Sequence, residues 1–173
     1  YKGSLERRYS FRYLKLKRTD SVRFAVDITA LYIDAVSAVD IDDVLPLNTA
    51  DSTLSAIDKI CVNTLKECEQ DVFEDGPKRR LWIGDLRLQA LVDYVTFRNT
   101  DLIKRCIYLF AEHLNEKGLV PPCVFPDTPP YADQWFYLDY SLCFVLCLAD
   151  YLENTGDKTL PEELYGIALH QIE

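Results

Sequence analysis

The sequence predicts a mainly α-helical protein that begins with a few antiparallel β-strands. Along residues 9–39, apolar and polar side chains alternate with a period of two, which is typical of half-buried strands. From residue 51 onward, apolar side chains recur every three or four positions, which is typical of helices with one buried face. The chain has 173 residues, of which 49% are apolar and 27% charged, so it can bury a core.

The strands are predicted from three short alternating runs. In the clearest run, at 22–28, every second residue is apolar. A similar run precedes it at 9–13 and another follows from Leu31, with a turn expected at 19–21. A few strands alone are only marginally stable. We therefore expect this segment to be the end of a larger antiparallel sheet.

Helical spacing begins after a short acidic linker at 40–47. The first helix is expected to start near Asp51 or Ser52, because either side chain can cap its N-terminus. The third helix is expected to start near Asn99 and to end near Gly118. The apolar stripes of the first three helices are Leu54, Ile57, Cys61, Leu65 and Cys68; Leu88, Leu91, Val92 and Val95; and Leu102, Cys106, Leu109, Phe110 and Leu114.

The fourth helix is expected around 137–154 and contains an uninterrupted apolar run at 142–149. A helix that is apolar on all sides is usually buried on all sides. Gly156 is expected to end this helix, and the fifth helix starts near Thr159, with a proline and acidic residues in its first turn. We expect the fifth helix to continue to the last residue, Glu173.

A charged segment at 73–85 lies between the first two helices. Gly76-Pro77 breaks regular structure, so the charges are expected on a loop. One interpretation is a solvated turn. We favour a sugar site, because the indole of Trp82 can stack on the apolar face of a pyranose while charged groups bind its hydroxyls. The charged residues are Glu74, Asp75, Lys78, Arg79, Arg80 and Asp85.

A second long loop, at 118–135, is rich in proline. A connection of this length in a compact domain is usually functional or disordered. The loop and the residues that follow it carry aromatic and acidic side chains, among them Asp133 and Trp135. We therefore favour a substrate-facing loop over a purely structural one.

The composition disfavours several classes of function. The net charge is −9, although residues 1–42 carry a net charge of +2, so the helical part is strongly acidic. This acidity disfavours nucleic acid as a partner. No apolar run reaches the roughly 18 residues that a membrane span needs. The cysteines are interpreted as core residues, and no Cys or His pattern has zinc-ligand spacing, so neither a metal nor a cofactor is expected.

The charged segment resembles the signature motif of glycoside hydrolase family 78, the inverting α-L-rhamnosidases. The resemblance implies that residues 1–42 are the end of a β-sandwich domain and that residues 43–173 are the N-terminal part of an (α/α)6 barrel. It also implies a rhamnose-containing carbohydrate as the substrate. The residues that carry it are Glu74-Asp75-Gly76-Pro77-Lys78-Arg79 followed by Leu81-Trp82-Ile83-Gly84-Asp85, and the turn at 154–158 is similar to a turn of the family.

The resemblance implies roles for five side chains. Asp75, Arg79 and Asp85 would bind rhamnose hydroxyls. Trp82 would form one wall of the rhamnose subsite, and Trp135 would form a second aromatic wall. An inverting glycosidase also needs a general acid and a general base. The family's acid follows the motif arginine, where this sequence has arginine and leucine, and the base lies in later helices, so neither catalytic group is assigned.

The absence of methionine, also from the first position, leads us to expect a fragment. Such a fragment is expected to aggregate alone and to need the remainder of its own chain as a partner. Three hypotheses on function remain. The chain is part of a glycosidase that releases terminal α-L-rhamnose, or it is a non-catalytic sugar-binding remnant, or it is a helical-hairpin interaction domain that binds no sugar. The aglycone, the linkage, the compartment and the oligomeric state are not predicted.

Overall fold

The structure, a computed structural model, describes residues 13–17, 19, 27–32, 36–40, 44, 47–75, 80–132 and 135–173. The chain divides into two units, Tyr1–Ala35 and Val36–Glu173, which are described separately. None of the described residues of the first unit lies in a helix or a strand, and Tyr13, Ile28 and Leu31 are exposed. The strands predicted there are not seen at these positions, and the rest of that prediction lies outside the described residues.

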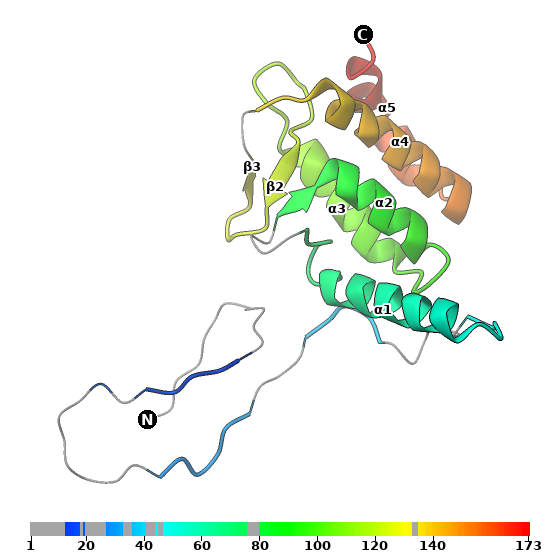
Figure 1. Cartoon of the computed structure of the whole chain (residues 1–173). Coiled ribbons are helices and arrows are strands. Elements are labelled where there is room, and N and C mark those ends of the chain that lie inside the picture. The colour runs from blue at the N-terminus through cyan, green and yellow to red at the C-terminus, as the bar shows by residue number, and fades with distance from the viewer. Residues whose placement is uncertain are drawn as a thin grey trace. The chain divides into compact units, whose positions relative to one another are not determined.

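The second unit confirms the mainly helical prediction. Its described part contains five helices and a small antiparallel sheet (Figure 1). In chain order the elements are α1 (Ser52–Cys68), β1 (Leu81–Trp82), α2 (Ile83–Asp93), α3 (Thr100–Glu112), β2 (Cys123–Phe125), β3 (Tyr131–Ala132), α4 (Leu138–Thr155) and α5 (Thr159–His170). No helix among the described residues is long and apolar enough to cross a membrane.

The helix starts follow the capping residues of the sequence. The Asp51 side chain accepts hydrogen bonds from the backbone N–H of Thr53, at 2.8 Å, and of Leu54, at 3.3 Å, which satisfies two donors of the first turn of α1. The side chain of Asn99 caps α3 in the same way by accepting from Leu102. At the other end of α4, Gly156 has φ of +71°, a conformation that glycine adopts without strain.

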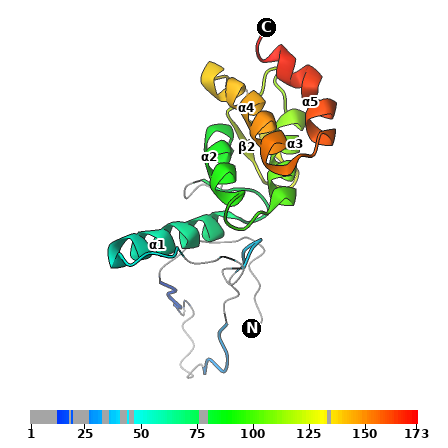
Figure 2. The same cartoon turned by 90° about the vertical axis from the view of Figure 1, so that its right-hand side faces the viewer.

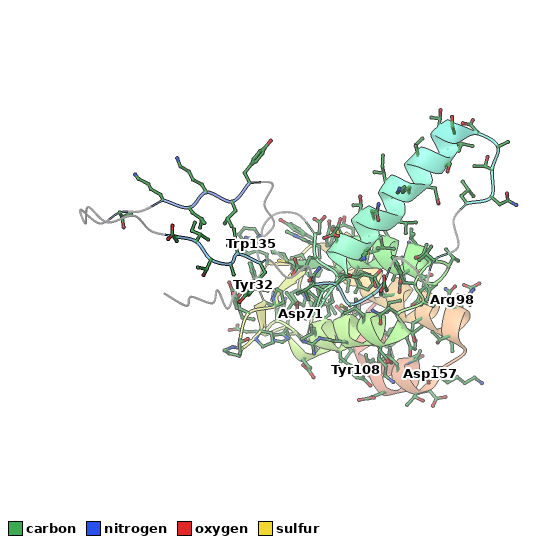
Figure 3. The ribbon with its side chains drawn as sticks, turned by 90° about the horizontal axis from the view of Figure 1, so that it is seen from below. Tyr32, Asp71, Arg98, Tyr108, Trp135 and Asp157 are labelled. Carbon is green, nitrogen blue, oxygen red and sulfur yellow. The ribbon has the colours of Figure 1, made fainter. Side chains whose placement is uncertain are left out.

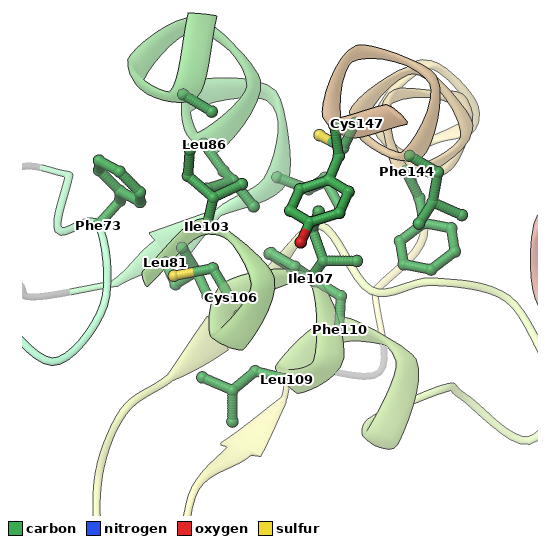
Figure 4. Packing of buried hydrophobic residues seen from close by; sticks show 14 of the residues in the cluster. Phe73, Leu81, Leu86, Ile103, Cys106, Ile107, Leu109, Phe110, Phe144 and Cys147 are labelled. Carbon is green, nitrogen blue, oxygen red and sulfur yellow. The ribbon is translucent and has the colours of Figure 1, made fainter. Parts of the chain in front are cut away.

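The core of this unit lies between α2, α3, α4 and α5. Helix α2 packs on α4, and α4 also contacts α3 and α5 (Figure 2). Figure 4 shows how side chains from three of these helices converge, with Leu86 from α2, Ile103 and Phe110 from α3, and Phe144 from α4. All four side chains are almost fully buried. Burial of such apolar surface is the main driving force for this packing.

The helices α2 and α4 bury different faces from those that the sequence suggested. In α2 the buried apolar residues include Ile83 and Leu86, whereas the predicted stripe around Leu88 is exposed. Helix α4 was expected to be buried all round, but Leu142 and Leu146 are exposed. Both helices carry apolar residues on more than one side, so only their contacts with the other helices decide which side is buried.

Helix α1 is also more exposed than its apolar stripe predicted. Only Val62 and Leu65 are buried, and Leu54 and Ile57 are about half exposed. The reason is that α1 does not pack along another described helix (Figure 2). Cys61, which was interpreted as a core residue, is exposed for the same reason, whereas Cys106, Cys123 and Cys147 are buried as predicted.

The proline-rich loop contains regular structure that was not predicted. Strand β2 pairs antiparallel with β1, so that Leu81 lies opposite Val124, and β3 pairs with the other edge of β2. The sheet therefore joins the loop to the charged segment, which contains β1. Helix α5 ends at His170 rather than at the last residue, and the next residue, Gln171, accepts a hydrogen bond from the backbone N–H of Val120 at 2.9 Å.

Candidate functional site

The charged segment is fixed at both ends by buried residues. Phe73 is buried just before the acidic residues, and Leu81 is buried just after the basic ones. The backbone N–H of Asp75 donates to the carbonyl of Arg80 at 2.9 Å, so the two arms of the segment pair like a short hairpin. Asp75 itself is exposed. Gly76, Pro77, Lys78 and the predicted site residue Arg79 lie outside the described residues.

Trp82 lies where β1 ends and α2 begins. Its position follows from the local sequence, because Leu81 and Ile83 on either side are fully buried and the Trp82 side chain is half-buried. The indole contacts the ring of Tyr140 edge-on, with 6.0 Å between centroids and 77° between planes. Tyr140 in turn contacts the ring of Tyr137 at 5.8 Å in the same manner. Three aromatic side chains are thus in contact beside the charged segment.

Gly84 allows the close approach between the first turn of α2 and the first turn of α4. A Cβ atom at this position would lie 3.2 Å from Cζ and 3.3 Å from Cε1 of the Tyr140 ring, which is tighter than an ordinary packing contact. The ring of Tyr140 therefore packs directly on the backbone of the Trp-Ile-Gly-Asp sequence. A larger residue here would push the two helix starts apart.

Asp85 is a half-buried carboxyl group in the first turn of α2. Burial raises its pKa above the ordinary value, repulsion from the Asp75 carboxylate raises it further, and a backbone hydrogen bond acts in the opposite direction. The pKa of the Tyr140 hydroxyl is also raised, first by burial and then by the negative charge of Asp85. Asp75, Asp85 and Tyr140 therefore share one electrostatic environment.

Arg80 is held against the sheet rather than among the carboxylates. Its guanidinium lies 4.5 Å from the centre of the Phe125 ring, which is a cation–π contact. Phe125 is stacked on Tyr131 of β3, with 4.5 Å between centroids and 6° between planes. The Arg80 Nε atom is buried without a hydrogen-bond partner among the described residues. This packing fixes the point where the charged segment enters β1.

Trp135 lies between β3 and α4 and is labelled in Figure 3. Its side chain is 63% exposed, and the next two residues, Phe136 and Tyr137, are also exposed. Among the described aromatic rings, Trp135 makes no ring contact with Trp82. The structure therefore brings Asp85, near Trp82 in sequence, close to Asp75, and it shows no ring contact that joins Trp135 to this group.

Tyr140 was missed by the sequence analysis. It was counted only as part of the fourth helix, yet it contacts Trp82 and Gly84 and lies near Asp85. The signal that could have found it is Gly84, because glycine at a helix start often marks the close approach of another group. Nothing in the sequence says which residue approaches.

The arrangement offers two kinds of contact to a ligand. Carboxylates accept hydrogen bonds from hydroxyl groups, and an indole offers a flat apolar surface with a polar edge. This combination suits a polar molecule that also has an apolar face. No group of three or more His, Cys, Asp or Glu side chains in the described part of the chain is placed to hold a metal ion.

Comparisons with known proteins agree with the motif. The model of a family described as the bacterial α-L-rhamnosidase six-hairpin glycosidase domain matches residues 42–169. A solved rhamnosidase from Klebsiella oxytoca with rhamnose bound is 48% identical to this chain, with a TM-score of 0.73, over 75% of this chain and 26% of that one. A family 78 rhamnosidase of Bacillus sp. GL1 is 25% identical, with a TM-score of 0.65, over 75% of this chain and 14% of that one.

No curated protein matches the sequence. The chain spans about a quarter of the length of the Klebsiella rhamnosidase and less of the Bacillus rhamnosidase. The family match nevertheless covers most of the chain and includes the charged segment, helices α1 to α4 and all of α5 except its last residue. The similarity to family 78 predicted from the sequence is confirmed. The chain belongs to the bacterial α-L-rhamnosidase six-hairpin glycosidase family.

Proposed function

We propose that the protein hydrolyses terminal α-L-rhamnose from glycosides or polysaccharides, with inversion at the anomeric carbon. The observation that carries this proposal is the group formed by Trp82, Asp85 and Asp75 at the start of α2, within the part of the chain that matches the rhamnosidase family. A rhamnosidase of known structure that is 48% identical to this chain has rhamnose bound. Rhamnose has hydroxyl groups and an apolar methyl group, which suit carboxylates and an indole respectively.

We assign sugar-binding roles to the five residues singled out in the sequence. Asp75, Arg79 and Asp85 bind hydroxyl groups of rhamnose, and Trp82 forms a wall of its subsite. Trp135 forms a second wall, and its exposure leaves the ring accessible to a ligand.

The chemistry requires two further groups. In an inverting glycosidase one carboxylic acid protonates the leaving oxygen and a second carboxylate activates water, and the two carboxyl groups are roughly 6.5 to 9.5 Å apart. We assign neither role to a residue of this chain. Asp85 is kept as a sugar-binding residue, although its raised pKa makes it easier to protonate than an ordinary aspartate.

A second candidate function is sugar binding without hydrolysis. It is favoured by the absence of a general acid after the motif arginine, Arg79. The next residues are Arg80 and Leu81, and no carboxyl group follows until Asp85. In this case the aromatic and acidic group would retain rhamnose without cleaving its glycosides.

The experiment that tests both functions combines binding and turnover. Rhamnose is titrated into the parent protein and into Trp82→Ala by calorimetry, and release from an aryl rhamnoside is followed separately. We expect Trp82→Ala to weaken rhamnose binding at least about ten-fold, which corresponds to about 1.4 kcal/mol. The matched control is Tyr165→Ala, which removes an exposed aromatic ring from α5.

The outcomes separate the candidates. Aryl rhamnoside cleavage by the parent supports the glycosidase, whereas rhamnose binding without cleavage supports the non-catalytic function. Equal rhamnose affinities for the parent and Trp82→Ala would exclude this sugar site and would favour the helical-hairpin interaction domain.

A further inference from the structure

Tyr140 is the only described side chain that joins the indole of Trp82 to another helix through a ring contact. Trp82 lies at the N-terminal end of α2, and Tyr140 lies in the first turn of α4. The edge-to-face geometry, at 6.0 Å and 77°, is one that aromatic pairs prefer. The orientation of the indole therefore depends on α4 as well as on its own strand and helix.

The ring of Tyr140 makes two further contacts. It lies against Gly84, where a Cβ atom would come within 3.2 Å of the ring. It also meets the ring of Tyr137 at 5.8 Å and 67°. These contacts limit the freedom of the ring to move, so it can serve as a support for the indole.

We propose that Tyr140 is a positioning residue of the sugar site, whose ring holds the Trp82 indole in the orientation that binds rhamnose. The proposal rests on the proposed function, because it names a further residue of the same site. It assigns the effect to the ring, which contacts Trp82, Gly84 and Tyr137, and not to the phenolic hydroxyl. The Tyr140 ring then acts through Trp82 and not by touching the reacting atoms.

The ring and the hydroxyl can be separated by two substitutions. Tyr140→Phe keeps the contacts with Trp82 and Gly84 and removes only the hydroxyl. Tyr140→Ala removes the ring. A third variant, Gly84→Ala, keeps Tyr140 but places a methyl group against its ring, so it should displace the support if the fold is retained. Retention of the fold is checked by far-ultraviolet circular dichroism.

The reporter is Trp82 itself. The chain contains two tryptophans, so in a Trp135→Phe background the emission comes from Trp82 alone. Acrylamide quenching of this emission, measured without sugar, reports how well the indole is packed. Rhamnose titrations of the same substitutions in the parent chain, which keeps Trp135, report the effect on binding. Tyr165→Ala, made in both backgrounds, is the control for loss of an exposed ring elsewhere.

We expect Tyr140→Ala and Gly84→Ala to increase quenching of Trp82 and to weaken rhamnose binding by about 2- to 12-fold, the range expected from losing one aromatic pair. Tyr140→Phe should match the Trp135→Phe protein in quenching and the parent chain in rhamnose affinity. The proposal is overturned if Tyr140→Ala changes neither quenching nor affinity, or if Tyr140→Phe loses as much affinity as Tyr140→Ala. If the parent binds no rhamnose, the proposed function fails, and the quenching measured without sugar still decides whether Tyr140 orients the indole.

Discussion

At the scale of single residues, Asp85 shows how the fold changes the pKa of a side chain that the sequence motif identifies. Its position in the first turn of α2 is favourable for a negative charge, because backbone N–H groups point toward it. Burial and the nearby Asp75 carboxylate act against this charge and raise the pKa of Asp85. Asp85 is therefore protonated at a higher pH than an ordinary aspartate.

This shift predicts the pH dependence of rhamnose binding. An ionised Asp85 accepts hydrogen bonds from sugar hydroxyls, and a protonated one loses part of this capacity. Rhamnose affinity should therefore fall as the pH is lowered through the pKa of Asp85, and this fall should occur above the ordinary aspartate value of 3.8. Calorimetric titrations across the acidic range measure it.

Asp85→Asn provides the control for this prediction. The amide keeps the shape of the side chain but does not ionise, so its rhamnose affinity should be lower and should lose the acidic dependence assigned to Asp85. An acidic loss of affinity that persists unchanged in Asp85→Asn would show that a group other than Asp85 is responsible.

The sequence could predict these residues only where their position depends on local structure. Trp82 and Asp85 were singled out by the local motif, but the sequence placed them on a loop, whereas the structure places Trp82 in β1 and Asp85 in the first turn of α2. Tyr140 is brought to the same place by the packing of α4 on α2, which no local pattern encodes. The roles of all three residues remain predictions until binding is measured.

At the scale of elements, the ends of three helices meet at a buried pair of acids. Glu69 follows the last turn of α1, Asp93 ends α2, and Asn99 caps α3. Both carboxyl groups are fully buried and within hydrogen-bonding reach of each other, and the Asn99 side chain donates to Glu69 at 3.5 Å. Burial raises the pKa of both carboxyl groups, and the charge of Asp93 raises the pKa of Glu69 further.

Protonation of this pair should make the fold sensitive to alkali. Burial, followed by the charge of Asp93, raises the pKa of Glu69 from its ordinary value of 4.5 to about 8. The folded state binds the Glu69 proton more tightly than the unfolded state does. The resulting contribution to the free energy of unfolding is therefore fully present below the ordinary pKa of Glu69, and it is lost as the pH rises through the pKa of the folded state. The free energy of unfolding should therefore decrease across this interval.

Glu69→Gln tests this prediction by keeping a hydrogen-bond donor that cannot ionise. Denaturant unfolding is measured below and above the interval, and the decrease in stability should be smaller for Glu69→Gln than for the parent. Glu67→Gln, on the exposed side of α1, is the control and should behave like the parent. An equal decrease in the parent and in Glu69→Gln would show that the pair does not hold the proton.

Helix positions were predicted better than helix faces, for a physical reason. Starts and ends depend on neighbouring residues, and Asp51, Asn99 and Gly156 occur at the ends where the sequence suggested them. The buried face depends on which other element packs there. In α2 the stripe around Leu88 satisfies helical periodicity, yet the helix buries Leu86 and Ala90 against its neighbours.

At the scale of the whole molecule, a well-buried core coexists with exposed apolar residues on the helices. Phe110, Phe144 and Ile107 are completely buried between α2, α3 and α4 (Figure 4). In contrast, three large apolar side chains of α1, Leu54, Ile57 and Ile60, are 49%, 51% and 65% exposed. Large exposed apolar patches of this kind favour association.

The 173-residue chain should therefore self-associate, and charge on the exposed side of α1 should reduce this. The double variant Ile57→Lys and Ile60→Lys removes apolar surface without touching the buried Val62 or Leu65. Light scattering after size exclusion, over a range of concentrations, should give a lower mean mass for the variant than for the parent.

The matched control is Asn63→Lys, which adds positive charge at an exposed polar position of the same helix. If the control lowers the mean mass as much as the double variant, net charge and not the apolar surface governs association. A parent that stays monomeric at every concentration would contradict the prediction, because it would mean that the exposed side chains of α1 do not drive contact between copies.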